Sequence, residues 1–444
     1  MRKLLTLFLM TTALFAAGCG GGGSSSNSGT GGGGGGGDTP ATIATPGPPN
    51  VEALIVDAGP AILTTPPNNQ PSINTAFITV QVCVPPGFTT CQTFDHIEID
   101  TGSVGLRILA DAADTSGHTF NLVLPALSVN GQPVAECLRF ADGDSWGSVN
   151  TANISLPISG EKSSAPFNVH VIGASSAGSP PPAACIPTPS PPLQEENTVL
   201  TFGANGILGV GPFINDCNSD GNCPTSGTSA TYYTCTTTAP ITCDPLSAST
   251  AQQVPNPIML FAKDNNGVII ELPAAANNGA ASLTNGALVF GIGTENNNAL
   301  GSATQLLADP QLAFISATLN GQTYPQSYFD SGSNGNFYSS SITTCPSPNN
   351  VWYCPSATVS ENATLQGTDG TMAAAPFNVA NADTLFMDNP TFTVFPELAG
   401  PGAIACTAQI CSLDLGLPFF FGRNVYTAIE GQTPSAPYFA YISN

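Results

Sequence analysis

The amino-acid sequence predicts a mostly β protein with two lobes, and three observations support this prediction. Short β-branched or aromatic runs alternate with Gly, Pro, Ser, Thr and Asn, as in strands separated by turns, and helical heptads are absent. The chain has 444 residues, enough for two cores once its low-complexity start is set aside. Two nearly identical Asp-containing stretches lie far apart in the sequence, as expected if the chain contains two related halves.

Residues 1–18 are expected to form a lipoprotein signal peptide. Arg2 and Lys3 precede an apolar run, and small residues then lead to Cys19. This end resembles a bacterial lipobox, which implies cleavage before Cys19 and lipidation of that residue, so the membrane would be contacted through the lipid anchor only. A plain secretory signal with a chance Cys is the alternative. Gly20 rather than an Asp follows, and by analogy with Gram-negative sorting this favours the outer membrane of the bacterial cell envelope.

Residues 19–50 are rich in Gly and Ser and then in Pro and Thr, so we expect a disordered tether. About 31 flexible residues give a root-mean-square reach of roughly 30 Å, which would hold the folded body away from the membrane. The glycine run is not a phosphate loop, because no Gly-Lys-Ser/Thr follows it. We expect an N-terminal β lobe over residues 51–275 and a C-terminal β lobe over residues 276–444.

The charge of the chain limits its partners. Acidic residues number 29 and basic ones only 7, so no basic patch is available to hold phosphates. This balance argues against nucleic acid and against anionic membrane surfaces as partners.

Each expected lobe contains an Asp loop at the end of an apolar run. Residues 75–82 alternate as in a half-buried strand, and residues 94–99 then lead into the first loop, Asp-Thr-Gly-Ser at 100–103. The second loop is Asp-Ser-Gly-Ser at 330–333. If the loops meet, their carboxylates can share one proton and activate a water, as in an acid–base enzyme. If they do not meet, each is an ordinary capped turn after a strand.

Two further echoes suggest homologous halves. Ala-Pro-Phe-Asn-Val occurs at residues 165–169 and again at 375–379, each time downstream of an Asp loop. A weaker echo relates residues 205–211 to residues 420–423, because both contain two apolar residues followed by a Gly. Such a Gly lets another backbone approach a buried strand closely.

The order of these motifs resembles the pepsin-like aspartic peptidases, from about Ile73 to the end of the chain. It is also similar to a group of uncharacterised exported bacterial lipoproteins with aspartic-peptidase-like sequences. Six segments have counterparts in the peptidase family: the first active-site loop (residues 94–103), the flap hairpin (140–147), the apolar-apolar-Gly segment (206–211), the strand opening the second lobe (286–293), the second active-site loop (327–333) and the closing segment (420–429).

The resemblance implies roles for the two Asp loops. Asp100 and Asp330 would form the catalytic dyad, one taking a proton from a bound water and the other protonating the substrate carbonyl oxygen. Thr101 and Ser331 would bond across the lobe interface. Gly102 and Gly332 would let the backbone approach the carboxylates. Ser103 and Ser333 would donate to the outer carboxylate oxygens, and because such donors lower a carboxyl pKa, an acidic optimum is expected.

The resemblance also implies a substrate-binding flap over the cleft, formed by Phe140, Asp142, Gly143 and Asp144. Phe140 stands where the family commonly has Tyr, so a hydroxyl is missing. Trp146 either covers the cleft or packs in the core. The implied function is an envelope-tethered, monomeric aspartic endopeptidase that needs no cofactor and binds a polypeptide in the inter-lobe cleft. The alternative is a degenerate scaffold that serves as a binding or structural module with a protein ligand.

Thirteen Cys less Cys19 leave twelve, so six disulfides are plausible in an exported chain. Spacing alone does not fix the connectivity, but five short-range pairs suggest themselves and two residues remain for each other. The suggested pairs are Cys83–Cys91, Cys217–Cys223, Cys235–Cys243, Cys345–Cys354, Cys406–Cys411 and Cys137–Cys185. Zinc is the rival explanation, but no Cys-x-x-Cys pair occurs, so no metal site is expected. Asp216 begins a partial calcium-loop pattern, for which a disulfide-bounded turn is the preferred interpretation.

Overall fold

The computed structural model describes residues 42–141, 143–178, 181–183, 185, 194–217, 223, 230–402, 406–407, 410–433 and 437–443. The signal peptide, Cys19, most of the tether and Asp142 lie outside the described residues. Regular structure is mostly strand, which confirms the mostly-β prediction. The α-helices are short: α1 (Ala61–Thr64), α2 (Val199–Phe202), α3 (Ala382–Asp388) and α4 (Leu417–Phe420). No helix in the described part of the chain has the length and apolarity needed to cross a membrane.

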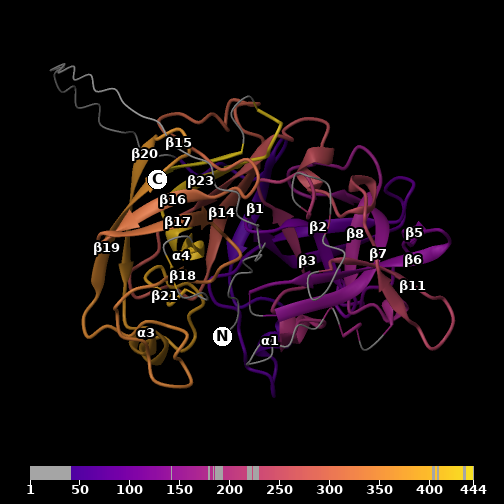
Figure 1. The fold of residues 1–444 in the computed structure, drawn as a ribbon, viewed down its shortest axis with the longest axis horizontal. Coiled ribbons are helices and arrows are strands. Elements are labelled where there is room, and N and C mark those ends of the chain that lie inside the picture. Colours follow the sequence, from indigo (N-terminus) through magenta and orange to yellow (C-terminus); the bar gives the residue numbers. More distant parts are fainter. Residues whose placement is uncertain are drawn as a thin grey trace, which may run out of the picture.

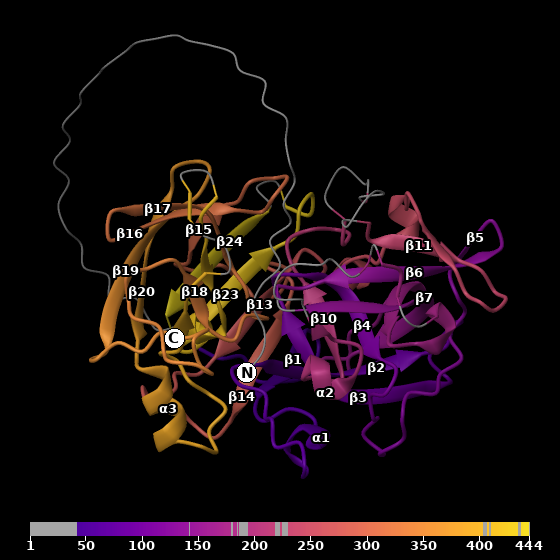
Figure 2. The ribbon, with the colours of Figure 1, turned by 60° about the horizontal axis from the view of Figure 1, so that its bottom comes forward.

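Two groups of strands lie side by side, and they follow the order of the chain (Figures 1 and 2). The first group is coloured indigo to magenta: β1 (Val51–Val56), β2 (Ala76–Cys83), β3 (Cys91–Asp100), β4 (Val104–Leu109), β5 (Ser128–Val129), β6 (Gln132–Arg139), β7 (Gly143–Ser155), β8 (Phe167–Ile172), β9 (Gln194–Glu195), β10 (Gly206–Val210), β11 (Tyr232–Cys235) and β12 (Cys243–Pro245). The expected strands at residues 75–82 and 94–99 correspond to β2 and β3.

The second group is coloured orange to yellow in Figure 1. Its strands are β13 (Gly267–Leu272), β14 (Leu283–Phe290), β15 (Thr304–Leu307), β16 (Ile315–Leu319), β17 (Gln322–Phe329), β18 (Asn336–Tyr338), β19 (Val359–Gln366), β20 (Met372–Val379), β21 (Ala399–Gly400), β22 (Leu413–Leu415), β23 (Arg423–Ala428) and β24 (Tyr438–Ser443).

A shared antiparallel sheet connects the two groups. β1 pairs with both β2 and β14, β14 pairs with β13, and β13 pairs with β23. β23 then pairs with β24, and β24 with β15. One face of this sheet buries a cluster of its own that includes Val51, Ile269 and Val289. The start and the end of the described chain are thus hydrogen-bonded into one sheet.

The strand connectivity around each Asp loop is the same. In the first group, β3 ends at Asp100 and β4 follows, and the later strand β10 lies between them, parallel to β3 and antiparallel to β4. In the second group, β22 lies between β17 and β18 in the same orientations. The outer neighbour is parallel in both cases, β8 beside β4 and β21 beside β18. Each Asp loop is therefore a tight connection between two strands held apart by a third.

This connectivity corrects one expected correspondence. The counterpart of β10 is β22 with Gly416 after it, whereas residues 420–423 follow α4 and enter the shared sheet as β23. The apolar-apolar-Gly pattern is intact only at residues 420–422 in this stretch, because Asp414 replaces an apolar residue in the true counterpart, residues 414–416. Both copies of the other echo lie in the second strand of an antiparallel hairpin, because residues 165–169 reach into β8 and residues 375–379 into β20. The two strands are not equivalent in the motif, since the counterpart of β8 is β21, which pairs with β18.

The structure contains all six disulfides suggested by the sequence. Five of them close loops between cysteines five to nine residues apart: Cys83–Cys91, Cys217–Cys223, Cys235–Cys243, Cys345–Cys354 and Cys406–Cys411. The sixth, Cys137–Cys185, spans 48 residues. Each of these six bonds stays within one group of strands, so the shared sheet and the Asp loops join the groups without a disulfide between them.

Candidate active site

The two Asp loops lie against each other and are joined by four hydrogen bonds. Thr101 Oγ1 donates to Phe329 O at 3.0 Å, and Ser331 Oγ donates to Ile99 O at 2.7 Å. The backbone N–H of Thr101 donates to Ser331 Oγ at 3.1 Å, and that of Ser331 donates to Thr101 Oγ1 at 3.0 Å. Both side chains are buried. Each hydroxyl therefore donates to one backbone carbonyl and accepts from one backbone N–H of the opposite loop. The arrangement is nearly two-fold symmetric.

The loop glycines bring each carboxyl group close to the opposite backbone. A Cβ atom on Gly102 would lie 2.5 Å from Asp330 Oδ1, and one on Gly332 would lie 2.6 Å from Asp100 Oδ1. Both separations are far below van der Waals contact, so a side chain at either position would displace a carboxyl group. The two carboxyl groups thus face each other across the pair of glycines.

The carboxyl groups of Asp100 and Asp330 are buried and held in the same way. Gly102 N donates to Asp100 Oδ1 at 2.7 Å, and Gly332 N donates to Asp330 Oδ1 at 2.9 Å. Asp100 is 6% exposed and Asp330 only 1%. Burial raises the pKa of Asp330 well above its usual range, and the charge of Asp100 raises it further. Two acids this close titrate as a pair, in which one proton can be shared.

The outer carboxyl oxygens of Asp100 and Asp330 differ in their hydrogen bonds to the loop serines. Ser333 Oγ lies 2.8 Å from Asp330 Oδ2, as the sequence predicts. Ser103 does not make the matching bond, because its buried hydroxyl has no hydrogen-bond partner among the described residues. The second loop has an additional polar neighbour, Asp414 of β22, whose Oδ2 lies 2.7 Å from Ser333 Oγ. The first loop has apolar Ile207 at the corresponding place in β10 and thus no acid to orient its hydroxyl.

Asp414 is a third carboxyl group of the site, and sequence reasoning missed it. It is 1% exposed, and burial followed by the charge of Asp100 raises its pKa well above the usual range. The available signal was an acid inside a short apolar strand, Leu413-Asp414-Leu415, because carboxyl groups are seldom fully buried without a specific partner.

The described residues among those expected to form a flap, Phe140, Gly143 and Asp144, lie just after β6 and at the start of β7. Phe140 N donates to Gly143 O at 2.7 Å, and the Phe140 ring packs edge-on against Phe202 of α2, with centroids 5.6 Å apart. A Cβ atom on Gly143 would lie 2.5 Å from the side chain of Glu196. Asp144 is buried, and burial raises its pKa to about 6. The contacts of this hairpin thus hold it to α2 and to the segment around β9.

Trp146 is a core residue. It is 3% exposed, its Nε1 donates to Gly178 O at 3.0 Å, and its ring packs edge-on against Tyr233. The same cluster contains the Cys137–Cys185 and Cys235–Cys243 disulfides. Of the two roles considered for Trp146, the structure therefore supports packing in the core.

A small pocket lies between the two groups of strands, next to the second Asp loop. Its volume is about 40 Å³. The first group contributes Leu63, Ser72 and Phe202, and α1 and α2 lie close together here (Figure 2). The second group contributes Asn334, which directly follows Ser333, and Trp352. Because Phe202 also supports Phe140, the pocket, the flap and the second Asp loop are neighbours.

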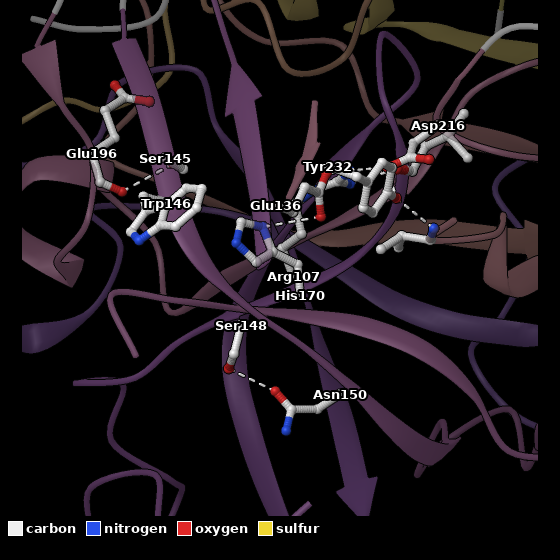
Figure 3. A network of polar contacts seen from close by, with 12 residues as sticks. Arg107, Glu136, Ser145, Trp146, Ser148, Asn150, His170, Glu196, Asp216 and Tyr232 are labelled. Carbon is white, nitrogen blue, oxygen red and sulfur yellow. Dashed lines mark hydrogen bonds and ion pairs between the residues drawn. The ribbon is translucent and has the colours of Figure 1, made fainter. Parts of the chain in front are cut away.

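A buried charge cluster supports the strand that follows the first Asp loop (Figure 3). Arg107 of β4 pairs with Glu136 of β6 at 2.8 Å and with Asp216 at 3.2 Å. Tyr232 OH donates to Asp216 Oδ2 at 2.6 Å, and His170 Nδ1 lies 3.3 Å from Glu136. Burial lowers the pKa of His170 to about 4, so this ring is neutral at pH 7.

This cluster also explains Asp216 and Arg107. Asp216 is an ion-pair partner beside the Cys217–Cys223 disulfide, and the rest of the partial calcium pattern lies outside the described residues. Arg107 Nη1 donates to Val104 O at 2.5 Å, four residues after Asp100. The guanidinium group therefore ties the start of β4 to the flap strand β6.

His96 forms a separate, partly exposed ion pair within β3, before the strand reaches Asp100. Its Nδ1 lies 3.0 Å from Asp95 Oδ1, and its Nε2 lies 3.4 Å from a carboxyl oxygen of Asp57. Burial opposes the charged ring, but hydrogen bonds and charges from the two aspartates outweigh it and raise the pKa of His96 to about 9. Among the described residues, metal-type ligand atoms converge at Cys345, Cys354 and Asp383, where the two sulfurs are bonded to each other and thus offer no thiolate.

The family of the chain can be assigned from its sequence. One family model matches residues 47–441, from just before β1 into β24, and so includes both Asp loops, the flap and Asp414. The chain belongs to this family, which is described as "Protein of unknown function (DUF3443)". No curated protein matches the chain. The assignment covers nearly all of the described structure, so the site belongs to the part that defines the family.

Proposed function

We propose that the protein is a bilobal, pepsin-like aspartic endopeptidase in which Asp100 and Asp330 activate a water. The observation that carries this proposal is the meeting of the two Asp loops, each with its glycine against the opposite carboxyl group. The matching strand connectivity around the loops supports two related lobes. The hydrogen bonds of Thr101 and Ser331 hold the pair rigid, which acid–base catalysis by two shared carboxyl groups requires.

The proposed reaction uses one ionised and one protonated carboxyl group. The ionised member takes a proton from the water as the water oxygen bonds to the peptide carbonyl carbon, and the other member donates its proton to the carbonyl oxygen. When the C–N bond breaks, the leaving amine takes the proton that the first carboxyl group gained from the water, and a hydroxyl of the intermediate returns its proton to the other carboxylate as the carbonyl re-forms. The raised pKa of Asp330 keeps a protonated member available above the ordinary carboxyl range, so activity should extend from acidic toward neutral pH.

The proposed substrate is a polypeptide bound between the lobes, close to the flap turn. The pocket lined by Phe202 and by Asn334, which directly follows the second Asp loop, would offer a small subsite. We further propose that the protein is a monomer in the bacterial cell envelope, anchored by lipid at Cys19, where an exported polypeptide would be its substrate. The signal sequence and the cysteine content support this location.

The second candidate function is a binding module on the same scaffold. Phe140 favours it, because this flap residue has no hydroxyl and its ring packs on Phe202. The Ser103 hydroxyl without a partner also favours it, because one dyad member then lacks its outer donor. Such a module would bind a protein ligand in the cleft and leave it uncut.

The test is digestion of a denatured protein substrate by the oxidised mature protein between pH 2.5 and 8. Asp100→Asn and Asp330→Asn should each lower the rate at least about a hundredfold, the usual contribution of a general acid or base. Pepstatin should inhibit the wild type. Asp369→Asn, which removes an acid from an exposed turn, is the matched control and should leave the rate unchanged.

Cleavage that survives both dyad substitutions and pepstatin would refute the dyad. If the oxidised protein cuts nothing at any pH yet retains a bound polypeptide that Asp330→Asn releases, the binding module is the better description.

A further inference from the structure

Asp414 is placed to act on the dyad through one hydroxyl group. Its Oδ2 and Asp330 Oδ2 lie on either side of Ser333 Oγ, at 2.7 and 2.8 Å. All three side chains are buried, Asp414 to 1% exposure. A carboxyl group in the middle strand of the motif has no packing advantage over the isoleucine that occupies the matching place in the other half.

Counting protons shows that one of the two acids must be protonated. A serine hydroxyl carries a single proton, so it can donate to only one of the two carboxyl oxygens. The other short contact is a hydrogen bond only if the carboxyl group itself donates to Ser333 Oγ. Two ionised carboxylates on either side of one hydroxyl would leave one contact without a proton, in a buried place where charge is costly.

The surroundings indicate that Asp414 is the donor. Asp330 Oδ1 accepts the backbone N–H of Gly332, which stabilises its charged form. Asp414 Oδ1 is buried without a hydrogen-bond partner in the described structure, so nothing besides Ser333 stabilises a charge on Asp414. Burial and the charge of Asp100 raise the pKa of Asp414 and that of Asp330 alike, so the hydrogen-bond partners decide between the two acids. The proton therefore resides on Asp414, and the hydroxyl of Ser333 points to Asp330.

The first half of the molecule provides an internal comparison. Ile207 and Asp414 occupy the same register, because Gly209 pairs with Asp100 and Leu415 with Phe329, the residue before Asp330. On the other side they pair with Arg107 and Phe337, each seven residues after its Asp. In this half Ser103 Oγ has no hydrogen-bond partner among the residues that the structure describes. The corresponding Ser333, in the half that has the third acid, hydrogen-bonds to Asp330 and Asp414.

We propose that Asp414 is a positioning residue of the dyad: in its protonated form it donates to Ser333 Oγ and so directs the Ser333 proton onto Asp330 Oδ2. This inference rests on the proposed function. When Asp414 ionises at higher pH, the Ser333 proton turns toward Asp414, and a third negative charge appears beside the dyad. The titratable groups that face Asp414 are Asp100, Asp330 and Tyr328 on the adjoining strand β17. Asp414 thus limits activity on the alkaline side.

The test is the pH profile of Asp414→Asn. Its amide can donate to Ser333 Oγ at every pH but cannot ionise. Its rate on the acidic side should stay within about threefold of wild type, and its alkaline limb should move up by about one pH unit or more, the usual size of carboxyl pKa shifts in folded proteins, because the ionisation that turns the Ser333 proton away from Asp330 no longer occurs. Asp414→Leu, which removes the donor, should lower kcat about tenfold with KM unchanged, the loss expected for one hydrogen bond. Glu271→Gln removes a different buried acid and is the control, with an unchanged profile.

A second measurement does not depend on activity. In protein labelled with ¹³C at the Asp carboxyl carbons, the signal absent from Asp414→Asn should show a carboxyl group that remains protonated at pH 6. A signal that titrates near pH 4 would overturn the inference, as would coinciding alkaline limbs of wild type and Asp414→Asn. If the wild type is inactive and Asp414 is nevertheless protonated at pH 6, the positioning of Ser333 stands and only the proposed peptidase activity fails.

Discussion

Replacing Thr101 with Val tests the contact between the two Asp loops without relying on any activity. The substitution keeps the shape of the side chain and removes only its hydroxyl. That hydroxyl donates to Phe329 O and accepts from Ser331 N, both at 3.0 Å, across more than two hundred residues of sequence. The variant therefore leaves one carbonyl and one N–H buried at the junction of the loops.

The expected loss of stability follows from these two groups. A buried polar group left without its partner costs about 1–3 kcal/mol, so the two together cost roughly 2–6 kcal/mol. Thr101 is 2% exposed, so water does not replace the lost partners in the folded protein. A loss of this size is large against the net stability of about 5–15 kcal/mol typical of folded proteins.

The assay is urea unfolding of the oxidised protein, followed by intrinsic fluorescence, with the midpoint and slope compared between variants. Thr101→Ser is the matched control, because it keeps the hydroxyl and loses one methyl group, a cost of about 1 kcal/mol. Ser331→Ala should destabilise to a similar degree, and the loss in the double variant should differ from the sum of the two single losses, since the residues are in contact within one hydrogen-bond network. The reasoning is refuted if Thr101→Val unfolds within about 0.5 kcal/mol of wild type, or if the Ser variant is destabilised as much.

Three other predictions concern the surrounding structure. Gly332→Ala places a Cβ atom 2.6 Å from the partner carboxyl group and should abolish cleavage, whereas Gly402→Ala, with its nearest neighbour at 3.6 Å, should retain it; comparable rates would contradict the close approach. Glu136→Gln leaves the buried Arg107 charge poorly compensated and should lower the free energy of unfolding by about 3–5 kcal/mol, measured in urea; an unchanged midpoint would argue against the ion pair. His96 has a raised pKa of about 9, so its stabilisation is complete below about pH 6.5 and is lost as the pH rises through 9; urea midpoints from pH 6 to 10 should show this decline, and His96→Asn should remove it.

The Asp loops could be located from the sequence because each is defined by a few consecutive residues. An Asp, a small hydroxyl residue, a Gly and a Ser after an apolar strand form a turn whose chemistry is evident within a few residues. The roles of Thr101 and Ser331 depend on both loops meeting, but the near-identity of the loops already indicated a symmetric pair. The short disulfides were accessible for the same reason, because cysteines five to nine residues apart have few other partners.

The role of Asp414, by contrast, can be assigned only when the fold is known, because the fold brings it next to Ser333. It lies 81 residues after the serine that it contacts and inside an apolar strand, and no spacing rule connects the two. The buried cluster around Arg107 is similar, because its acids lie 29 and 109 residues away. Burial and strand pairing decide these contacts. The mistaken correspondence of residues 420–423 with β10 had the same origin, since the three-residue pattern is intact at 420–422 but broken by Asp414 in the strand whose pairing matches β10.

The attachment of the first described residues to the shared sheet has a mechanical consequence. Ala44 N donates to Glu271 on β13, and Thr42 O accepts from Asn424 on β23. A force applied through the residues before Thr42 would enter the molecule at these two strands and then be borne by the pairing of β1 with β14. The Asp loops are outside that load path. A protein held by its N-terminal segment could thus withstand tension while the geometry of its two carboxyl groups stayed unchanged.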